Sequence, residues 1–245
     1  YTRYASPFGR QRVSPISRHQ NFLYRPDNCV LFLPGLPGSG STITDFSGNG
    51  NNGTITGATW TRLPTGLWYL DFDGTDDQID CAKGASLSFP AGTDMTFKCW
   101  FKWDTAFESK YIIGNINSAI TRAQYCILGG TGAKLRWQDF GAVASDDYDA
   151  IGSAISENVW HHLVASISVN TLTFYLDGVQ AGATYSVANR CLETERGNTC
   201  FGEAGDWKGG GNFNGGQALQ TLLSTAWTQT QAIGSYNQER HLFGI

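Results

Sequence analysis

From Val30 onward, hydrophobic and polar positions follow the two-residue period of β-strands. The clearest case is 95–103, where every odd position from Met95 to Trp103 is apolar. This pattern predicts an antiparallel strand with one side on a core. Alternating or continuous apolar runs predict further strands at 30–33, 70–73, 79–81, 111–114, 124–128, 133–137, 160–168 and 172–176.

Turn and cap signals complete this pattern. Asp177-Gly178 directly follows the run 172–176 and predicts a two-residue hairpin, because both turn positions need a positive φ. Thr228 and Gln231 have the spacing of a capping box, which predicts one short helix near the end of the chain. Strands do not alternate with helices as they do in parallel α/β folds. The pattern therefore favours an all-β, two-sheet antiparallel sandwich.

Composition agrees with this fold class. The 245 residues include 30 Gly and one Met, and 13% are aromatic, so strand and turn formers outweigh helix formers. With 41% hydrophobic residues the chain can bury a sizeable core. One large domain accounts for the length.

The first 27 residues differ from the rest. They contain three Pro and show no periodicity, so we expect an extended arm at 1–27 followed by a folded domain at 28–245. The arm holds five Arg and one Asp, a charge of +4, which leaves −8 on the domain out of a total of −4. A basic arm on an acidic body predicts docking on itself, on an acidic partner or on neighbouring copies. Five Arg are too few to indicate a nucleic-acid partner.

Membrane and cysteine signals narrow the environment. No apolar run reaches 18 residues, so no membrane span is expected. Six Cys form an even number, which is compatible with an oxidising compartment, and no CxxC pair indicates zinc. Cys191 and Cys200 lie on either side of a polar loop and are the pair predicted to form a disulfide. Free buried thiols are the alternative.

Six segments occur in a characteristic order. They are DFSGNGNNGT (45–54), GATW (57–60), LDFDGTDD (70–77), MTFKCWFKW (95–103), WHHLVASI (160–167) and FYLDGV (174–179). Together they resemble the laminin-G-like, concanavalin A-like jelly-roll domains over about residues 28–240. The resemblance implies two curved antiparallel sheets and a binding or interaction module of secreted, cell-surface or viral proteins, often with one calcium ion.

A calcium site is predicted from short oxygen-bearing side chains. The predicted ligands are Asp45, Ser47, Asn49, Asp76 and Asp77. The first three alternate before Gly50, like the opening of a calcium loop, and the last two are adjacent carboxylates that a cation could hold together. The alternative is a turn in which these side chains bond to their own backbone. The chain also lacks the acidic pair that family members often carry near the C-terminus, where Gly216 to Gln220 stand here.

Two aromatic positions are candidate sugar platforms. Trp207 lies in a Gly-rich loop with Asn212, and Trp137 is followed by Gln138 and Asp139. An exposed aromatic ring with nearby amides and carboxylates is suited to glycan recognition. Trp100, opposite the predicted core side of 95–103, is a third possibility. The alternative for each is packing within the fold.

Catalytic signatures are missing. The Glu-x-Asp-x-x-Glu string of related glucanases, Gly-x-Ser-x-Gly and HExxH do not occur, so a non-enzymatic role is expected. The first hypothesis is an extracellular binding module for a glycan or another surface ligand, assisted by calcium, on a cell or virion surface. The alternative is a structural subunit of an extracellular assembly (a virion coat, decoration protein or filament) in which the arm 1–27 ties neighbours together.

Overall fold

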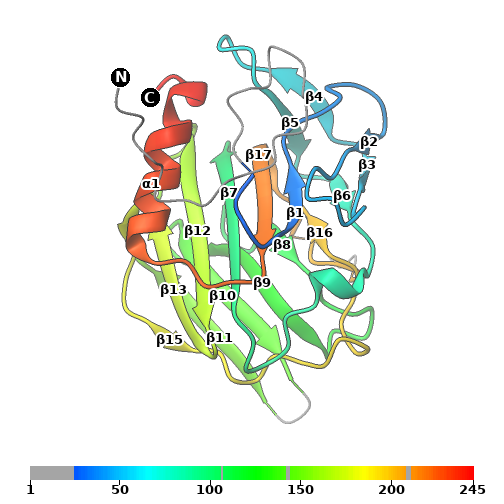
Figure 1. The fold of residues 1–245 in the computed structure, drawn as a ribbon, viewed down its shortest axis with the longest axis vertical. Helices are drawn as coiled ribbons and strands as arrows, with labels where there is room; N and C mark the ends of the chain where they lie inside the picture. Colours follow the sequence, from blue (N-terminus) through cyan, green and yellow to red (C-terminus); the bar gives the residue numbers. More distant parts are fainter. Residues whose placement is uncertain (1–24, 106, 142–143, 208–210) are drawn as a thin grey trace, which may run out of the picture.

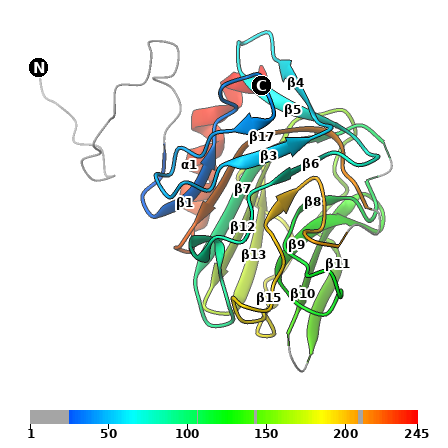
Figure 2. The same ribbon diagram turned by 90° about the vertical axis from the view of Figure 1, so that its right-hand side faces the viewer.

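The computed structural model describes residues 25–245 except 106, 142–143 and 208–210. Within these residues two antiparallel sheets pack face to face (Figures 1 and 2), which confirms the predicted sandwich. Sheet A runs in the order β14 (Val179–Gln180), β13 (Thr171–Leu176), β12 (His161–Ser168), β7 (Met95–Trp103), β17 (Asn214–Leu223), β5 (Trp68–Asp73) and β4 (Thr59–Arg62). The strands β1 (Cys29–Leu33) and β15 (Tyr185–Ser186) join β17 and β13.

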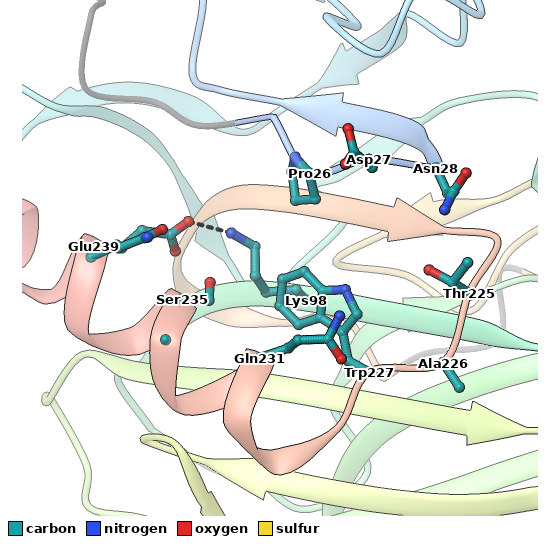
Figure 3. Close-up of a pocket in the computed structure, with 12 residues that line it drawn as sticks. Pro26, Asp27, Asn28, Lys98, Thr225, Ala226, Trp227, Gln231, Ser235 and Glu239 are labelled. Carbon is teal, nitrogen blue, oxygen red and sulfur yellow. Dashed lines mark hydrogen bonds and ion pairs between the residues drawn. The ribbon is translucent and has the colours of Figure 1, made fainter. Parts of the chain in front are cut away.

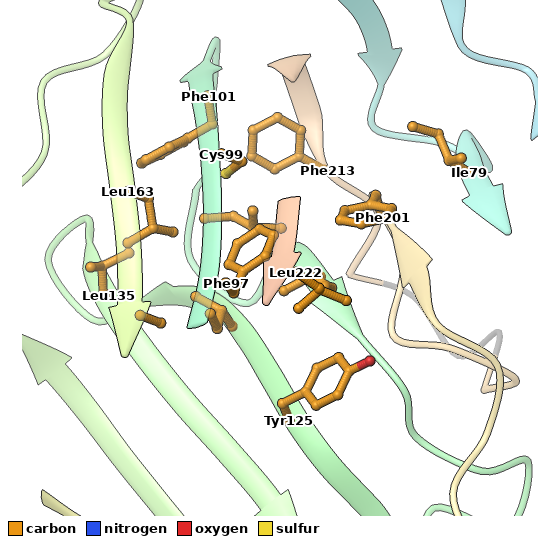
Figure 4. Close-up of a cluster of buried hydrophobic side chains, with 14 of the residues drawn as sticks. Ile79, Phe97, Cys99, Phe101, Tyr125, Leu135, Leu163, Phe201, Phe213 and Leu222 are labelled. Atoms are coloured by element: carbon orange, nitrogen blue, oxygen red, sulfur yellow. The ribbon is translucent and has the colours of Figure 1, made fainter. Parts of the chain in front are cut away.

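Sheet B packs against sheet A. Its order is β11 (Ser145–Ile151), β10 (Lys134–Phe140), β9 (Ala123–Gly130), β8 (Tyr111–Gly114), β16 (Cys200–Phe201), β6 (Gln78–Asp80), β3 (Gly53–Thr56) and β2 (Thr42–Ile43). The core fills the space between the sheets (Figure 4), where Phe97 of β7 lies 6.2 Å from Phe201 of β16 between ring centroids. Both rings are fully buried, as is Leu222 of β17. The apolar sides of both sheets are therefore covered by each other.

The one α-helix among the described residues covers the outer face of sheet A (Figure 1). Helix α1 (Gln229–Glu239) begins at the predicted capping box, in which Thr228 and Gln231 each bond to the other's backbone. Its Ala232 packs with Val164 of β12 and Tyr175 of β13. Two short 3₁₀ turns, η1 (Ala85–Leu87) and η2 (Arg240–Phe243), complete the described helices. None of these helices has the length and apolar character that crossing a membrane requires.

The predicted hairpin is also confirmed. Asp177 and Gly178 have φ values of 52° and 79° and connect β13 to β14. Positive φ at both positions matches the right-handed twist of the flanking strands. The sequence at this turn therefore determined the local structure.

The side chains of β7 differ from the prediction. We expected one covered and one free side, but Lys98 is 1% exposed and Trp100 is fully buried. Helix α1 and η2 cover this second side, where Phe243 stacks on Trp100 at 4.1 Å between ring centroids. Trp100 is thus packed rather than available as a sugar platform. The alternation correctly placed the residues on two sides but could not show that α1 would return to cover one of them.

The structure contains no disulfide between Cys191 and Cys200. None of the six cysteines, all of which lie within the described residues, takes part in a disulfide. Cys200 lies in β16 opposite Asp80 and Gly114, whereas the backbone of Cys191 donates to Ala123 at the start of β9. The structure does not form the predicted disulfide: Cys191 lies in a loop bonded to β9, whereas Cys200 belongs to β16.

Candidate functional site

The outer face of sheet B carries the candidate site, and strand β10 shows why. Its side chains alternate, with Leu135, Trp137 and Asp139 buried and Arg136 and Gln138 half-buried on the other side. The Trp137 indole is fully buried and its Nε1 donates to Asp139 Oδ2 at 3.0 Å. Burial raises the pKa of the Asp139 carboxyl to about 7. The predicted sugar platform of Trp137 and Asp139 is therefore wrong, because the pair is part of the packed interior.

Five side chains on the outer face form what we call the Tyr111 patch: Tyr111, Arg136, Gln138, Asp147 and Trp207. The strand register brings the first four together. Tyr111 of β8 and Arg136 of β10 both lie opposite Leu128 of β9, and Gln138 lies opposite Asp147 of β11. Residues opposite each other on neighbouring strands share a face, so these side chains gather at one place.

Hydrogen bonds connect the polar members of the Tyr111 patch. The Tyr111 hydroxyl donates to Gln138 Oε1 at 3.3 Å, and Gln138 Nε2 donates to Asp147 Oδ2 at 3.1 Å. Arg136 forms a two-pronged contact with the same carboxylate, with Nε to Oδ1 at 2.9 Å and Nη2 to Oδ2 at 2.7 Å. Bidentate pairs of this kind fix the orientation of both groups. The patch is therefore preorganised.

Trp207 supplies a second aromatic ring. It is half-buried and meets the Tyr111 ring edge-on, with 6.3 Å between centroids. The loop is fastened to the sheet because the Tyr111 backbone donates to the Gly211 carbonyl at 2.8 Å. Asn212, the other predicted ligand contact in this loop, is 6% exposed and donates to Glu203 Oε2 at 2.9 Å. The structure thus leaves Trp207 accessible and uses Asn212 to hold its own loop.

The two charged groups of the Tyr111 patch, Arg136 and Asp147, hold each other in the ionised form. Burial alone would raise the pKa of Asp147, but hydrogen bonds from Arg136 and Gln138 hold it below its ordinary value. The hydrogen bond from Arg136 to Asp147 likewise raises the pKa of the guanidinium. Near neutral pH the patch offers one cation, one anion, an amide and the half-buried ring of Trp207, whereas the Tyr111 ring is 6% exposed and supports Trp207 from the sheet. Such a surface can pack on an apolar ring face while bonding to hydroxyl groups around it.

The sequence pointed to Trp207 and, as a neighbour of Trp137, to Gln138, but it did not indicate Tyr111, Arg136 or Asp147. A partial signal was present, because Arg136 and Gln138 share a side of the predicted strand 133–137 and its continuation. Tyr111 and Asp147 come from other strands. Only the order of strands in sheet B brings them next to Gln138.

The five predicted calcium ligands do not form one shell. Asp45 is 8% exposed, and its carboxylate accepts from the backbone N–H groups of Phe32, Ser47 and Asn51 at 2.8–3.0 Å and from the Ser47 hydroxyl at 2.7 Å. Asn49 Nδ2 donates to Ser47 Oγ at 3.0 Å. These donors occupy the positions that a cation would need. The Asp45 group therefore does not fit a metal, and the alternative of a self-bonded turn describes it.

Asp76 and Asp77 lie elsewhere. Asp76 and Asp77 come just before the first residue of β6. The turn at Asp45 lies near the other end of β6, because Asn51 Nδ2 of this turn donates to Oγ of Ser86, which follows β6, at 2.9 Å. Asp76 and Asp77 join Asp73 instead, with one carboxylate oxygen of each within 4.8 Å of the others. Asp73 and Asp76 are exposed. Backbone N–H groups donate to one oxygen each of Asp77 and Asp73, at 2.8 and 2.7 Å, so the other oxygens of these residues and the Asp76 carboxylate are the ones that fit the oxygen chemistry of calcium. The predicted shell is divided because β6 separates its two halves.

Comparison with known families places this geometry in context. Residues 73–232 match the model of the concanavalin A-like lectin/glucanases superfamily. The matched segment includes the Asp73 turn, all members of the Tyr111 patch and the first residues of α1. No match was found among curated proteins.

Solved structures share the fold at low identity. The binding domain of Paraclostridial Mosquitocidal Protein 1 superposes with a TM-score of 0.67 and 17% identity, covering 86% of this chain and 52% of that one. Botulinum neurotoxin type C, whose cell entry is dependent upon interaction with two ganglioside molecules, gives a TM-score of 0.61 and 12% identity, covering 86% of this chain and 51% of that one. Domain 4 of an extracellular arabinanase from Geobacillus stearothermophilus, solved in complex with arabinotriose, gives a TM-score of 0.62 and 16% identity. The match covers 84% of this chain and 97% of that one. The chain thus spans about half the length of the toxin chains.

Proposed function

The chain belongs to the concanavalin A-like lectin/glucanase superfamily, and from that premise we propose that it is a non-catalytic binding module that recognises a glycan through the Tyr111 patch. The observation that carries the proposal is the preorganised set on one sheet face: the half-buried Trp207 ring, which packs against the buried Tyr111 ring, and three bonded polar groups. The extracellular space, including a cell or virion surface, is the environment in which such a ligand would be met.

The similar structures support a binding role. One was solved with arabinotriose, and another comes from a toxin whose cell entry depends on gangliosides. Arabinotriose is an oligosaccharide, and gangliosides carry a glycan. A surface ligand that carries a glycan is therefore the partner that we propose for this chain.

The charge state of the Tyr111 patch favours binding over hydrolysis. A retaining glycosidase needs two carboxyl groups about 5–5.5 Å apart, one of them protonated. Within the patch Asp147 is the single carboxylate, Arg136 neutralises it, and its pKa is lowered. A group held in the ionised form is a poor general acid.

Calcium enters the proposal at a different place from the Asp45 turn. Asp73, Asp76 and Asp77 would hold the ion, which would supply charge compensation for three adjacent carboxylates. Its role would be to hold the turn between β5 and β6. The alternative of a structural assembly subunit rests on the arm 1–27, most of which lies outside the described residues, and it stays a prediction.

A glycan array tests the proposal. We expect binding to at least one class of glycan by the whole chain, and a loss of about tenfold or more in Gln138→Ala and Trp207→Ala. Gln180→Ala is the matched control, because Gln180 is exposed on β14 of the other sheet. Equal binding by Gln138→Ala, Trp207→Ala and Gln180→Ala would refute the assignment to this patch.

A further inference from the structure

A cavity of about 550 Å³ lies between helix α1 and the outer face of sheet A (Figure 3). Residues 26–28, residues 225–227 and one side of α1 line it, and Lys98 reaches it from β7. It is on the opposite side of the sandwich from the Tyr111 patch, because the two sheets turn their outer faces away from each other. Its volume is within the usual range for small-ligand sites.

Lys98 is a charged group with unused hydrogen-bonding capacity. It is 1% exposed and pairs with Glu239, as the dashed line in Figure 3 shows. The other Glu239 oxygen accepts from Trp100 Nε1 at 2.8 Å. An ammonium group has three N–H donors, and among the described residues only Glu239 accepts one from Lys98. A buried donor without an acceptor is costly, so a further acceptor at this place would be stabilised.

The rest of the lining consists mainly of neutral polar groups. The side chains of Asn28, Thr225 and Gln238 form no hydrogen bond with other described residues, and Gln231 uses only its oxygen, at the helix cap. Trp227 adds an aromatic surface. Because Glu239 already balances the charge of Lys98 and Asp27 lies exposed at the rim, a second anion gains little here. Hydroxyl groups, which both donate and accept, match these amides and the spare Lys98 donors.

We propose that this cavity is a second ligand site that takes a neutral, polyhydroxylated molecule of monosaccharide size, with one hydroxyl oxygen accepting from Lys98. The ring would lie near Trp227, and its other hydroxyl groups would meet Gln231, Gln238 and Asn28. The site is independent of the Tyr111 patch. It would let the chain hold a sugar on each side of the sandwich.

Gly234 of α1 provides a way to close the cavity without breaking its ion pair. It lines the cavity, and no atom lies within 4 Å of where its Cβ would be. Gly234→Leu therefore fits the backbone and projects into open space, while Gly234→Ala adds one carbon at the same position. Both variants change the helix backbone in the same way, but only Gly234→Leu fills the cavity. Comparing the two variants therefore separates blocking of the cavity from an effect on the helix.

The test is an amide NMR titration of the whole chain. The probes are glucose, galactose, mannose, arabinose and N-acetylglucosamine at up to about 50 mM, with glucuronate as an anionic probe. We expect a neutral sugar to shift the amides of α1 and 225–227, with about a tenfold or greater loss of affinity in Gly234→Leu and retention in Gly234→Ala. Gln238→Leu is a second variant, to be used if Gly234→Leu does not fold. It replaces an amide that lines the cavity by an apolar group, so it should also weaken sugar binding.

Three results would overturn the inference. The first is that no neutral sugar shifts the amides of α1, which would mean that the cavity holds solvent only. The second is that glucuronate binds more tightly than every neutral sugar. The third is that affinity is unchanged in both Gly234→Leu and Gln238→Leu. Gln138→Ala distinguishes the two sites. Sugar shifts confined to the Tyr111 patch and lost in Gln138→Ala would support the proposed function while rejecting the cavity site.

Discussion

Replacing Asp45 by Ala is expected to destabilise the domain strongly, whether or not calcium is present. The Asp45 carboxylate accepts three buried backbone N–H bonds, from Phe32 on β1 and from Ser47 and Asn51 in its own turn. Alanine leaves all three donors without an acceptor. Because Phe32 belongs to β1, the substitution also weakens the attachment of this edge strand to the turn.

The magnitude follows from these contacts. A hydrogen bond to a charged acceptor contributes about 1.5–3 kcal/mol to stability. The sum for three such bonds is an upper limit on the loss, because the contributions of neighbouring bonds do not add fully. Partial access of water to the turn lowers the loss further, and we expect about 3–5 kcal/mol for Asp45→Ala. For a domain of this size that corresponds to a decrease in Tm of roughly 10 °C. Asp45→Asn keeps one accepting oxygen, so it should lose about 1–3 kcal/mol.

Urea unfolding followed by tryptophan fluorescence measures this loss. Each variant is measured in EDTA and in about 1 mM calcium, a concentration typical of extracellular modules. The expected loss is the same in both buffers, and Asp76→Ala in EDTA should change stability little, because Asp76 is exposed. Two results would refute the reasoning: a loss below about 1 kcal/mol, or wild-type protein in EDTA that is as unstable as Asp45→Ala.

Further predictions concern the metal, the buried acid, the ion pair and the helix. Chelation should lower the Tm of the wild type by a few degrees and leave Asp76→Asn unaffected in a calorimetric scan, and no response of the wild type would reject the Asp73–Asp77 site. The pKa of Asp139 is raised from 3.8 to about 7, so the native state holds this proton more tightly than the unfolded chain does. The resulting stabilisation is present in full below pH 3.8 and falls as the pH rises from there to about 7. Asp139→Asn should remove this fall from the stability–pH curve, and an unchanged slope would contradict it. Glu239→Gln should cost about 3–5 kcal/mol because it leaves Lys98 buried without its counterion, and Lys98→Met combined with it should recover part of the loss. Gly234→Ala should raise stability by about 0.5–1 kcal/mol in urea, and a decrease would show that its Cβ position is not open.

Local features of the chain were predictable because local rules decide them. The strand 95–103, the Asp177-Gly178 hairpin and the capping box at Thr228 all occur where the sequence placed them. The central strand β17 was not predicted. Its sequence Asn214 to Leu223 begins with two glycines after its first residue and alternates poorly, since side chains on both of its faces are buried. Leu222 lies in the core between the sheets, and Ala218 lies in the cluster of Trp100 and Phe243 on the other face.

The candidate site shows the same division. Trp207 could be selected from its Gly-rich loop, but Trp137 looked equally suitable until the structure placed it in the core. Periodicity tells which residues share a side of one strand, and it does not tell which side faces the other sheet. The choice between Trp137 and its neighbours Arg136 and Gln138 depended on that second fact.

By itself the sequence determined the fold class, most strands, the hairpin, the helix cap and the family, because each depends on neighbouring residues or on segments in a fixed order. The tertiary structure decided which polar groups meet. It joined Tyr111, Gln138 and Asp147 from three strands of sheet B, placed Lys98 under α1 beside Glu239, and separated Asp45 from Asp76. Hydrogen bonds and ion pairs act over a few ångströms, and residues distant in the sequence reach that range only through strand order and layer packing.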